Sequence, residues 1–566
     1  MRFFNAGLAC SLTLLCAACA SSGANTAGHV RPIEVPPPAS RADETAQWWY
    51  RSGAARAASN GAMGGQAKNV IVFLGDGMSL TTVAAARILE GQRLGGTGEE
   101  HALSWERFPA TGLSKTYNTD SQTPDSAGTM TAVATGVKSH MGAIGVSSGK
   151  RLDCADSQGR HVQSWLRLAS DAGLDTGIVT TARLTHATPA ATYAHVPDRN
   201  WENDTDLPEA AVAAGCRDIA QQILDFAPGR GPKVLMGGGR GNFLPAGMRD
   251  PEYDDKVGQR LDGRDLTAEW RAAHPGGAVV WNTAQLRAAR NADAVFGLFE
   301  PDHMQYEHDR NTGDDGEPDL AEMTRFAIER LAKGGKGYVL LVEGGRIDHA
   351  NHDGNAFRAL DETVAMSRAV QAAVDATSAD DTLILVTADH SHTLNFVGYP
   401  TRGNPILGKV RGRVSEDDDP NAYALDATGL PYTTLVYANG PGYTGASNQQ
   451  PAGPKTFLHK PSSFEPAAGR PDLREVDTEH PDFMQEALVP MRSESHGGDD
   501  VGIWARGPGS DAVRGTVEQN VIYHLIVQAT PALRRQLCAT GHCNDDGVPV
   551  DLPAMTPVTA PDRPTD

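Results

Sequence analysis

Short apolar runs recur along the chain and are separated by longer polar or amphipathic stretches. The runs that are bounded by polar or glycine-rich turns span residues 70–74, 176–180, 233–236, 338–342, 382–386 and 501–505. Continuous apolar runs of this length are typical of strands that are buried on both faces of a parallel sheet. We therefore expect these segments to be neighbouring strands of one sheet.

Helical patterns follow several of these runs. The clearest spans residues 354–376, where Phe357, Leu360, Val364, Val370 and Val374 recur at near-helical spacing. Strands that alternate with helices indicate βαβ units. The pattern therefore predicts an α/β fold with three layers, α/β/α, and a mainly parallel central sheet.

Two regions interrupt this alternation. Residues 198–317 and 396–492 are rich in Gly, Pro and polar residues and contain few periodic runs. We interpret both as insertions on the core, each forming a small subdomain. Residues 43–59 predict a short helix that carries Trp48, Trp49 and Tyr50.

The charge balance limits the class of partner. The chain has 566 residues, enough for one large domain with insertions, and a formal net charge of −20. Because phosphate backbones attract basic surfaces, this balance argues against nucleic-acid binding. It does not argue against an enzyme that acts on anions, since bound divalent metal ions reverse the local field.

The first 19 residues resemble a bacterial export signal. Arg2 is followed by an apolar stretch that is short for a membrane span. The segment ends Leu15-Cys16-Ala17-Ala18-Cys19, which resembles a lipobox with Cys19 as the lipidated residue, although Cys16 stands where Leu is usual. Simple signal cleavage near Cys19 is the alternative. We expect an exported protein, either periplasmic or a lipoprotein of the outer membrane or cell surface.

Composition also distinguishes a tether near the N-terminus and a tail at the C-terminus. Residues 20–42 are rich in Ser, Gly and Pro and read as a tether, which leads into an N-terminal helical arm over 43–68. Residues 544–566 are rich in Pro and Asp and are expected to be a disordered tail.

Cysteine usage fits an oxidising compartment. Without the signal segment and Cys19, an even set remains: Cys154, Cys216, Cys538 and Cys543. Proximity suggests a disulfide between Cys538 and Cys543, and Cys154–Cys216 follows by elimination. The alternative is that these are free buried thiols.

Residues 343–352 concentrate metal-binding side chains directly after the apolar run at 338–342. Glu343 falls at the carboxyl end of this strand, where open α/β sheets place their ligand sites. Asp348 and His352 are four residues apart, so a helix starting there places both on one face. A carboxylate and a neutral imidazole in this arrangement can bind one zinc ion. Alone, the pair is weak evidence, and on an ordinary helix it would indicate a solvated face.

Other predicted strands end in similar residues. Asp76 follows 70–74, Asp389 and His390 follow 382–386, and His496 precedes 501–505. His186 and Thr188 lie beyond the strand at 176–180. An Asp between two glycines is more often a turn residue than a ligand. The evidence for a metal site is therefore that such residues recur at several strand ends.

Ser126 is a candidate nucleophile. It stands in Asp125-Ser126-Ala127-Gly128-Thr129, at the start of a small-residue segment that can be helical. A helix N-terminus offers free backbone N–H groups and a positive dipole end to an alkoxide or a phosphate. The alternative is that Ser126 or Asp125 serves only as the helix N-cap.

Together these segments resemble the alkaline phosphatase family. The matching motifs occur in the family's order and with similar spacing: Gly75-Asp76-Gly77-Met78, Asp125-Ser126-Ala127-Gly128-Thr129, His186-Ala187-Thr188-Pro189, Asp198-Arg199-Asn200-Trp201, Glu343 to His352, Asp389-His390-Ser391-His392 and His496-Gly497-Gly498. The resemblance covers residues 43–543. It implies a catalytic domain over 69–543, with 396–492 as a crown-like insertion.

The resemblance implies an enzyme that hydrolyses phosphate monoesters to an alcohol and inorganic phosphate. Ser126 would be the nucleophile that becomes phosphoserine, and Arg199 would clamp the phosphoryl oxygens. Two Zn²⁺ and one Mg²⁺ are implied. Their ligands would be Asp348, His352 and His496 for the first zinc, Asp76, Asp389, His390 and Ser126 for the second zinc, and Asp76, Thr188 and Glu343 for the magnesium.

Three further histidines qualify the resemblance. His186 and His349 place the chain nearer the animal-type branch, since enterobacterial members carry Asp and Lys at these positions. We expect His186 and His349 to be hydrogen-bonding groups beside the metals rather than ligands, and His392 to lie close to the metals without binding one.

The animal-type enzymes also carry a calcium site, which the resemblance extends to this chain. Glu252, the Phe299 carbonyl and Glu300 match its segments, and hard oxygen ligands of this kind suit Ca²⁺. For the last carboxylate the nearest match is Glu317, with Asp315 as the rival.

The family's N-terminal arm reaches across a two-fold dimer, so the resemblance implies a homodimer. Trp48, Trp49 and Tyr50 would then be anchors of its interface.

Two other interpretations compete. One is a phosphodiesterase or sulfatase of the same superfamily, which would use Thr or a modified Cys or Ser as nucleophile. The other is a surface lipoprotein that binds metal or phosphate without catalysis. Such a protein would have lost a ligand or the nucleophile, whereas every matched position is filled here.

Overall fold

The computed structural model describes residues 30–226, 230–412, 419 and 422–555. The predicted signal segment and Cys19 lie outside the described residues. The described part contains a central ten-stranded sheet, in the order β17-β2-β16-β8-β1-β7-β3-β4-β6-β5. β16 pairs antiparallel with β8 and β2, whereas every other pairing in this sheet is parallel.

The strands of the central sheet are β1 (Asn69–Gly75), β2 (Ala110–Lys115), β3 (Asp175–Arg183), β4 (Val234–Gly238), β5 (Gly277–Val280), β6 (Ala294–Leu298), β7 (Tyr338–Gly344), β8 (Thr382–Ala388), β16 (Val501–Arg506) and β17 (Gly515–Glu518). The strands outside it are β9 (Ser391–His392), β10 (Leu394–Phe396), β11 (Leu435–Gly440), β12 (Lys455–Thr456), β13 (Phe483–Met484), β14 (Ala487–Pro490) and β15 (His496–Gly497).

The α-helices are α1 (Ala46–Ser59), α2 (Leu80–Arg93), α3 (Ser126–Thr135), α4 (Cys154–Ser157), α5 (Trp165–Asp171), α6 (Ala187–Ala190), α7 (Glu209–Ala213), α8 (Ile219–Gln222), α9 (Leu266–Ala273), α10 (Thr283–Ala288), α11 (Leu320–Ala332), α12 (Arg346–His352), α13 (Ala356–Ala376), α14 (Val521–Ala529) and α15 (Pro531–Ala539).

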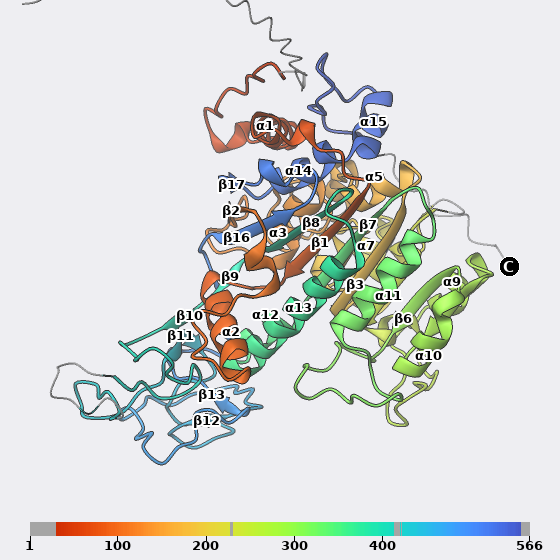
Figure 1. Ribbon diagram of the computed structural model, residues 1–566. Coiled ribbons are helices and arrows are strands. Elements are labelled where there is room, and N and C mark those ends of the chain that lie inside the picture. Colours follow the sequence, from red (N-terminus) through yellow and green to blue (C-terminus); the bar gives the residue numbers. More distant parts are fainter. Residues whose placement is uncertain (1–29, 227–229, 413–418, 420–421, 556–566) are drawn as a thin grey trace, which may run out of the picture.

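Alternation along each central strand divides the core between the two faces of the sheet. In β1, Val70, Val72 and Leu74 join the hydrophobic cluster under α3, α5 and α14. Ile71 and Phe73 point the other way, into the cluster under α2, α11 and α13. The helices that cover these clusters lie on the two sides of the sheet (Figure 1). The predicted three-layer α/β/α fold is confirmed.

All of the predicted strands are confirmed, as β1, β3, β4, β7, β8 and β16, and the helix predicted at 354–376 is α13. One interpretation was wrong. Residues 198–317 are not an insertion on the core, because they supply β4, β5 and β6 to the end of the central sheet. β4 was predicted from its apolar run, but β5 and β6 are only four and five residues long and were not recognised in the sequence.

Residues 396–492 do stand apart from the central sheet. They carry β11 and β14, which form a small sheet with β10, and the β12–β13 pair. In Figure 1 this region, which we call the crown region, lies below the β9 end of the molecule. Tyr437 of β11 donates a hydrogen bond from its hydroxyl to Asn351 Oδ1 in α12, at 2.7 Å, so the crown region is fastened to the core.

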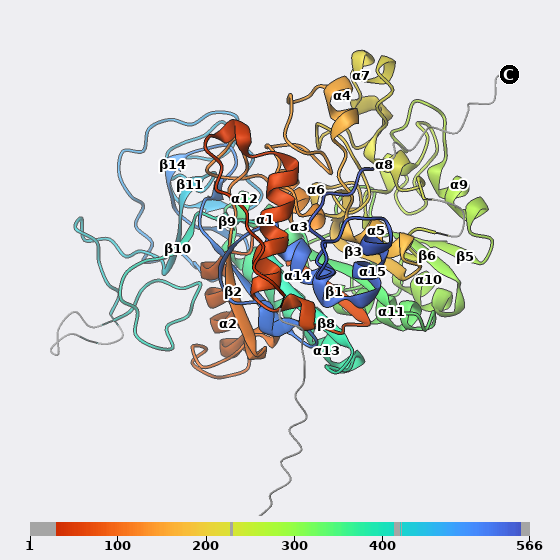
Figure 2. The same ribbon diagram turned by 90° about the horizontal axis from the view of Figure 1, so that it is seen from above.

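The N-terminal arm packs on its own chain. Figure 2 shows α1 lying across α14. Trp49 and Tyr50 are buried, and the Tyr50 ring contacts the rings of Tyr523 and His524. The structure therefore differs from the expectation that Trp49 and Tyr50 are interface anchors, because their apolar surface is already covered. Trp48 is only partly buried and donates its Nε1 hydrogen to Pro36 O.

The two chain ends meet beside this helix. Val548 and Val550 are buried against Ala54 and Ala58 of α1. Residues 544–555 therefore differ from the expected disordered tail, because two valines in a Pro- and Asp-rich stretch are enough to anchor it. Arg31 pairs with Asp546 at 3.0 Å, so the described end of the predicted tether lies against the same segment.

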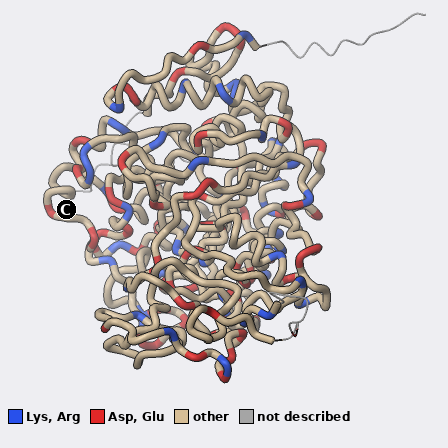
Figure 3. The backbone as a smooth tube through the Cα atoms, turned by 90° about the vertical axis from the view of Figure 1, so that its left-hand side faces the viewer, with Lys and Arg blue, Asp and Glu red and all other residues tan. Residues whose placement is uncertain are grey.

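The expected disulfides are both present, as Cys154–Cys216 and Cys538–Cys543. Among the described residues, no helix combines the length and the hydrophobicity that crossing a bilayer requires. Acidic and basic positions are interspersed on the side of the molecule drawn in Figure 3, with no separate basic face there.

Candidate functional site

The predicted site residues converge on the carboxyl edge of the sheet. Four adjacent parallel strands, β8, β1, β7 and β3, end side by side, and the residue pairs Leu74–Glu343 and Gly75–Ala388 are in register. Asp76 and Asp389 directly follow β1 and β8, and Glu343 is the last residue but one of β7. The topology thus collects carboxylates that are far apart in the sequence into one place.

Ser126 is the first residue of α3, and Asp125 is its N-cap. The Asp125 carboxylate accepts a hydrogen bond from the Gly128 N–H at 3.2 Å, so Asp125 performs the capping. Ser126 is left free for other contacts. Its Oγ lies 3.0 Å from His390 Nε2 and donates to Asp76 Oδ1 at 3.3 Å, in a buried position.

Asp348, His352 and His496 form the first metal-type group. His352 and His496 donate their Nδ1 hydrogens to the main-chain oxygens of Glu494 and Pro124, so each Nε2 carries a lone pair. These lone pairs face each other at 3.1 Å, and Asp348 Oδ1 lies 3.4 and 3.3 Å from them. Ligands of a tetrahedral zinc ion lie about 3.3 Å apart, given bonds of about 2.0–2.1 Å. The spacing therefore fits a cation of this kind.

Asp76, Asp389, His390 and Ser126 form the second group. His390 Nε2 lies 3.3 Å from Asp76 Oδ1 and 3.3 Å from Asp389 Oδ2, with Ser126 Oγ completing the set. The other Asp389 oxygen accepts hydrogen bonds from the Gly77 and His390 N–H groups, which fixes its orientation. One nitrogen and three oxygens thus lie close together, and there are fewer hydrogens than contacts between them.

Three oxygens around Glu343 form the third group. Asp76 Oδ2, Thr188 Oγ1 and Glu343 Oε1 are buried and have no hydrogen-bond partner among the described residues. The second Glu343 oxygen accepts a hydrogen bond from Thr180 at 2.5 Å. Unpaired buried oxygens of this kind are costly unless a cation binds them, and hard oxygen ligands suit Mg²⁺.

The electrostatics also favour cations. Burial, together with the charges of Asp348 and Glu343, raises the pKa of Asp76 well above its ordinary value. Burial raises the pKa of Glu343 to about 8, and burial and the Asp76 charge raise the pKa of Asp389 to about 6. Several carboxylates packed in one buried site repel each other, and divalent metal ions remove this repulsion.

Arg199 closes one side of the site. It donates from Nη1 to Asp125 Oδ2 at 3.3 Å and from Nη2 to His186 Nε2 at 3.0 Å. His186 also lies within metal-ligand reach of Asp76 and Glu343, and its Nδ1 has no partner among the described residues. A guanidinium held beside Ser126 offers a planar pair of donors for an oxyanion.

His349 accepts a hydrogen bond from Arg346 Nη1 at 2.9 Å. Its ring contacts those of His186 and His303, with centroids 5.3 and 4.1 Å away. Sequence reasoning missed His303, which comes from the loop after β6 and has no spacing relation to the other two. Burial lowers the pKa of all three imidazoles well below their ordinary value, so they are neutral.

His392 lies between two carboxylates. Its Nε2 donates to Asp348 Oδ1 at 2.7 Å and its Nδ1 to Glu494 Oε2 at 2.5 Å. Both ring nitrogens are therefore used by hydrogen bonds. Glu494 was also missed, although its place two residues before His496 could have suggested it. Thr180 and Thr129, which donate to Glu343 and Asp389, were missed because nothing in the sequence distinguishes them from other strand and helix threonines.

The predicted calcium residues lie apart from these groups. Tyr253 donates to Glu300 at 2.8 Å, and Glu252 pairs with Arg240 at 2.7 Å. Burial and the Glu300 charge raise the pKa of Glu317 to about 9. Glu317 is buried with one oxygen unpaired among the described residues, whereas Asp315 is exposed, so the placement favours Glu317. Phe299 donates its N–H to Gly237 O, which keeps this segment beside β4.

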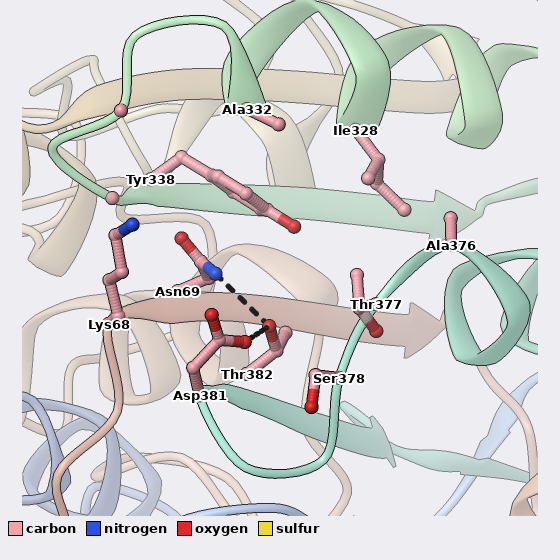
Figure 4. A pocket seen from close by; sticks show the side chains of 12 residues that line it. Lys68, Asn69, Ile328, Ala332, Tyr338, Ala376, Thr377, Ser378, Asp381 and Thr382 are labelled. Carbon is pink, nitrogen blue, oxygen red and sulfur yellow. Dashed lines mark hydrogen bonds between the residues drawn. The ribbon is translucent and has the colours of Figure 1, made fainter.

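The opposite edge of the sheet has a pocket of a different character. It has a volume of about 230 Å³ and lies where β1, β7 and β8 begin, lined by residues that include Lys68, Tyr338 and Asp381. Asn69, Thr382 and Asp381 hydrogen-bond to one another on its wall (Figure 4). It gathers no group of metal-type ligands, so the carboxyl edge remains the candidate site.

Comparisons with known proteins agree with this geometry. The family model described as alkaline phosphatase matches residues 67–532. The tissue-nonspecific alkaline phosphatase of Homo sapiens is 44% identical over 472 residues, covering 82% of this chain and 83% of that protein. An alkaline phosphatase of Gadus morhua is 43% identical and covers 82% of this chain and 92% of that protein. The crystal structure of Thermus thermophilus alkaline phosphatase aligns with a TM-score of 0.57 at 26% identity, over 83% of this chain and 92% of that chain.

Proposed function

Because the chain belongs to the alkaline phosphatase family and is a phosphatase, we propose that it hydrolyses phosphate monoesters through a phosphoserine at Ser126. The observation that carries this proposal is the position of Ser126 Oγ. It lies 3.0 Å from the His390 lone pair, beside Asp76 and at the start of α3, while Asp125 does the capping. A serine that only capped the helix would not be aimed at metal-type ligands.

The three groups would hold two Zn²⁺ and one Mg²⁺. Asp348, His352 and His496 would bind one zinc, Asp76, Asp389, His390 and Ser126 the other, and Asp76, Thr188 and Glu343 the magnesium. Support comes from the opposed lone pairs of His352 and His496 and from the unpaired oxygens around Glu343. When bound, such ions lower the pKa of coordinated oxygens and stabilise charge on the attacking and leaving oxygens.

The protein's own groups then have distinct tasks. Ser126 Oγ forms a bond to phosphorus as the ester P–O bond breaks, and the alcohol leaves. Water cleaves the phosphoserine in a second step, which releases inorganic phosphate and restores the hydroxyl. Arg199 is held beside this site by Asp125 and His186, and its guanidinium binds phosphoryl oxygens. The free N–H groups at the start of α3 add a positive field.

His186, His349 and His392 act beside the metals by hydrogen bonding. His349 accepts a hydrogen bond from Arg346. His392 donates to Asp348 and to Glu494, and His186 accepts from Arg199 and so orients it. The presence of His186 and His349 supports an animal-type site.

A calcium ion would bind at Glu252, the Phe299 carbonyl, Glu300 and Glu317. The buried, mutually repelling carboxyls of Glu300 and Glu317 support this site. Arg240 already neutralises Glu252, so the ion would compete with one guanidinium for that carboxylate.

We further propose that the protein is exported, as a periplasmic protein or as a lipoprotein anchored at Cys19, and acts as a homodimer on small phosphate monoesters. The paired cysteines support export, because disulfides persist in oxidising compartments. Among the three aromatics of the arm, Trp48 keeps enough exposed surface to contact a partner.

A comparison of mono-aryl and bis-aryl phosphates tests the proposed activity. We expect preferential hydrolysis of the monoester, because Arg199 and the metal-type groups surround a dianionic phosphoryl group. A preference for the diester would contradict the proposal and favour a phosphodiesterase. Metal analysis of the same preparation should find about two zinc ions and one magnesium ion per chain.

A further inference from the structure

Glu494 is a buried carboxylate in the loop that leads to His496. It is 1% exposed, and its Oε2 lies 3.8 Å from Nδ1 of His352, the ring nitrogen that faces away from the first metal-type group. Both of its oxygens are used: Oε2 accepts from His392 Nδ1 at 2.5 Å, and Oε1 accepts from the Thr393 N–H and hydroxyl at 2.7 and 2.6 Å. A buried carboxylate with this many donors is held in one orientation.

Through His392, the Glu494 side chain reaches Asp348. The His392 ring donates from one nitrogen to Glu494 and from the other to Asp348 Oδ1, at 2.7 Å. A Cβ added to Gly77 would lie 2.4 Å from this ring, so the ring is also packed tightly from the β1 side. Asp348 Oδ1 is the same oxygen that faces His352 and His496. The direction of this oxygen therefore depends on where Glu494 holds His392.

Through its main chain, Glu494 also reaches His352. Its carbonyl oxygen accepts the hydrogen of His352 Nδ1, which leaves the lone pair on Nε2 and aims it at His496 Nε2. The Glu494 N–H in turn donates to the His352 carbonyl at 2.9 Å, so the loop and the end of α12 are joined at two points. One residue thus contacts two imidazoles of the same cluster from two directions.

We propose that Glu494 is a positioning residue that orients Asp348 and His352 for the metal bound by Asp348, His352 and His496. This inference rests on the proposed function for the identity of that site. Its specific content is that the carboxylate of Glu494, which reaches the metal ligand Asp348 through two hydrogen bonds, sets the metal affinity and the geometry of the site. Removing such outer partners typically costs about 10–100-fold in metal affinity or activity.

The test compares Glu494→Ala with Asn439→Ala in the full chain. Asn439 exchanges two hydrogen bonds with Ser495, at 2.9 Å each, so it supports the same loop without touching a histidine. Zinc affinity is measured by competition with a chromophoric chelator, and site geometry by the visible spectrum of the Co²⁺-substituted protein. We expect Glu494→Ala to weaken one zinc site by about 10-fold or more and to change the spectrum. Asn439→Ala should leave both unchanged.

A conservative variant separates position from charge. In Glu494→Gln the amide oxygen can accept from Thr393 and the amide N–H₂ can donate to His392 Nδ1, which leaves Nε2 as the donor to Asp348. We expect this variant to regain most of the affinity. If Glu494→Ala does not fold, Glu494→Asp replaces it, because the shorter side chain withdraws the carboxylate from His392. Its expected effect is the same loss.

Zinc affinity and Co²⁺ spectrum equal to wild type in Glu494→Ala, or in Glu494→Asp where that replaces it, would overturn the inference. Equal losses in Glu494→Ala and Asn439→Ala would also overturn it, because they would show a general effect of loosening the loop. Failure of the proposed function would look different: the wild-type protein would bind the metals and show these variant effects but would not hydrolyse phosphate monoesters.

Discussion

His352 and His496 illustrate how main-chain contacts decide the chemistry of a side chain. Each gives its Nδ1 hydrogen to a carbonyl oxygen, and this leaves two lone pairs 3.1 Å apart with a carboxylate between them. Neither ring could bind a metal in the other tautomer at this position. The spacing of Asp348 and His352 predicts their shared helix face, but the tautomers depend on Glu494 and Pro124, which no sequence pattern connects to them.

Ser126 is a second case in which the sequence does not determine the role of a side chain. The sequence leaves open whether Ser126 or Asp125 caps the helix, because both residue types are good N-caps. The structure resolves this through the Gly128 N–H, which donates to Asp125. His303 could not be predicted, since it lies on a loop whose approach to the site depends on the packing of distant strands.

Substitution of Arg199 tests the proposed oxyanion clamp. Arg199→Ala should raise KM and lower kcat/KM by roughly 10–100-fold, because two charge-assisted donors are lost. Arg199→Lys should recover only part of this, since an ammonium lacks the planar fork. Steady-state kinetics and inhibition by inorganic phosphate provide the measurement. Unchanged KM and unchanged phosphate inhibition in Arg199→Ala would contradict the assignment.

Among the elements, long buried strands were predictable and short ones were not. β1, β7 and β8 carry continuous apolar runs because helices cover both of their faces. β5 and β6 lie at the end of the sheet and are four and five residues long, so loops dominate the sequence around them. The helix of the arm was predicted, but the packing of Trp49 and Tyr50 on their own chain was not, because aromatics that contact a partner and aromatics that pack on their own chain have the same sequence pattern.

The packing of α1 leads to a prediction that separates Tyr50 from Trp48. Tyr50 is fully buried against α14, so Tyr50→Ala should lower the free energy of unfolding by about 3–5 kcal/mol. Trp48→Ala should change stability little and should weaken the proposed dimer. Denaturant titration and analytical ultracentrifugation distinguish the two effects. A dimer that is weakened by Tyr50→Ala without loss of monomer stability would contradict this account of the arm.

The ion pair between Lys138, which follows α3, and Glu518 of β17 also gives a pH dependence. Burial lowers the pKa of Lys138 to about 8, although the Glu518 charge opposes this. The unfolded lysine titrates near 10.5, so between these values the unfolded state binds more protons than the folded state. The contribution of Lys138 to stability therefore rises with pH across this window, by up to roughly 3 kcal/mol, and is constant below it.

Lys138→Met provides the comparison, since Glu518 keeps its contact with Lys115 at 2.7 Å. Urea unfolding of both proteins at several pH values from 7.5 to 10 measures the difference, with these limits chosen to span roughly the titration window. We expect the wild-type protein to gain stability relative to the variant as the pH rises. Parallel curves for the two proteins would contradict the assigned shift.

At the scale of the whole molecule, the fold brings several carboxylates together in a buried site, where their mutual repulsion is strongest. The chain carries a net charge of −20, and Asp76, Glu343, Asp348 and Asp389 are all buried at one sheet edge. The family resemblance predicts these positions from the sequence, and the topology explains them, because β8, β1, β7 and β3 are neighbours. Divalent ions that bind only the folded state would stabilise it by mass action.

Removal of metal should therefore affect stability as well as activity. Dialysis against a chelator should abolish hydrolysis and lower Tm by several degrees or more, since a loss of 1 kcal/mol already shifts Tm by about 1–4 °C in a protein of this size or smaller. Zn²⁺ followed by Mg²⁺ should restore both. An unchanged Tm after verified metal loss would show that the buried carboxylates do not depend on bound cations.

The central claim is that Ser126 is phosphorylated during turnover. The most direct measurement is acid quenching of the protein during hydrolysis of an aryl phosphate, followed by peptide mass spectrometry. The account predicts one phosphoryl group on Ser126, and for Ser126→Ala neither this group nor more than a residual rate, with a loss on the order of 10³-fold or more. A phosphoryl group on another residue, or full hydrolysis by Ser126→Ala, would contradict it.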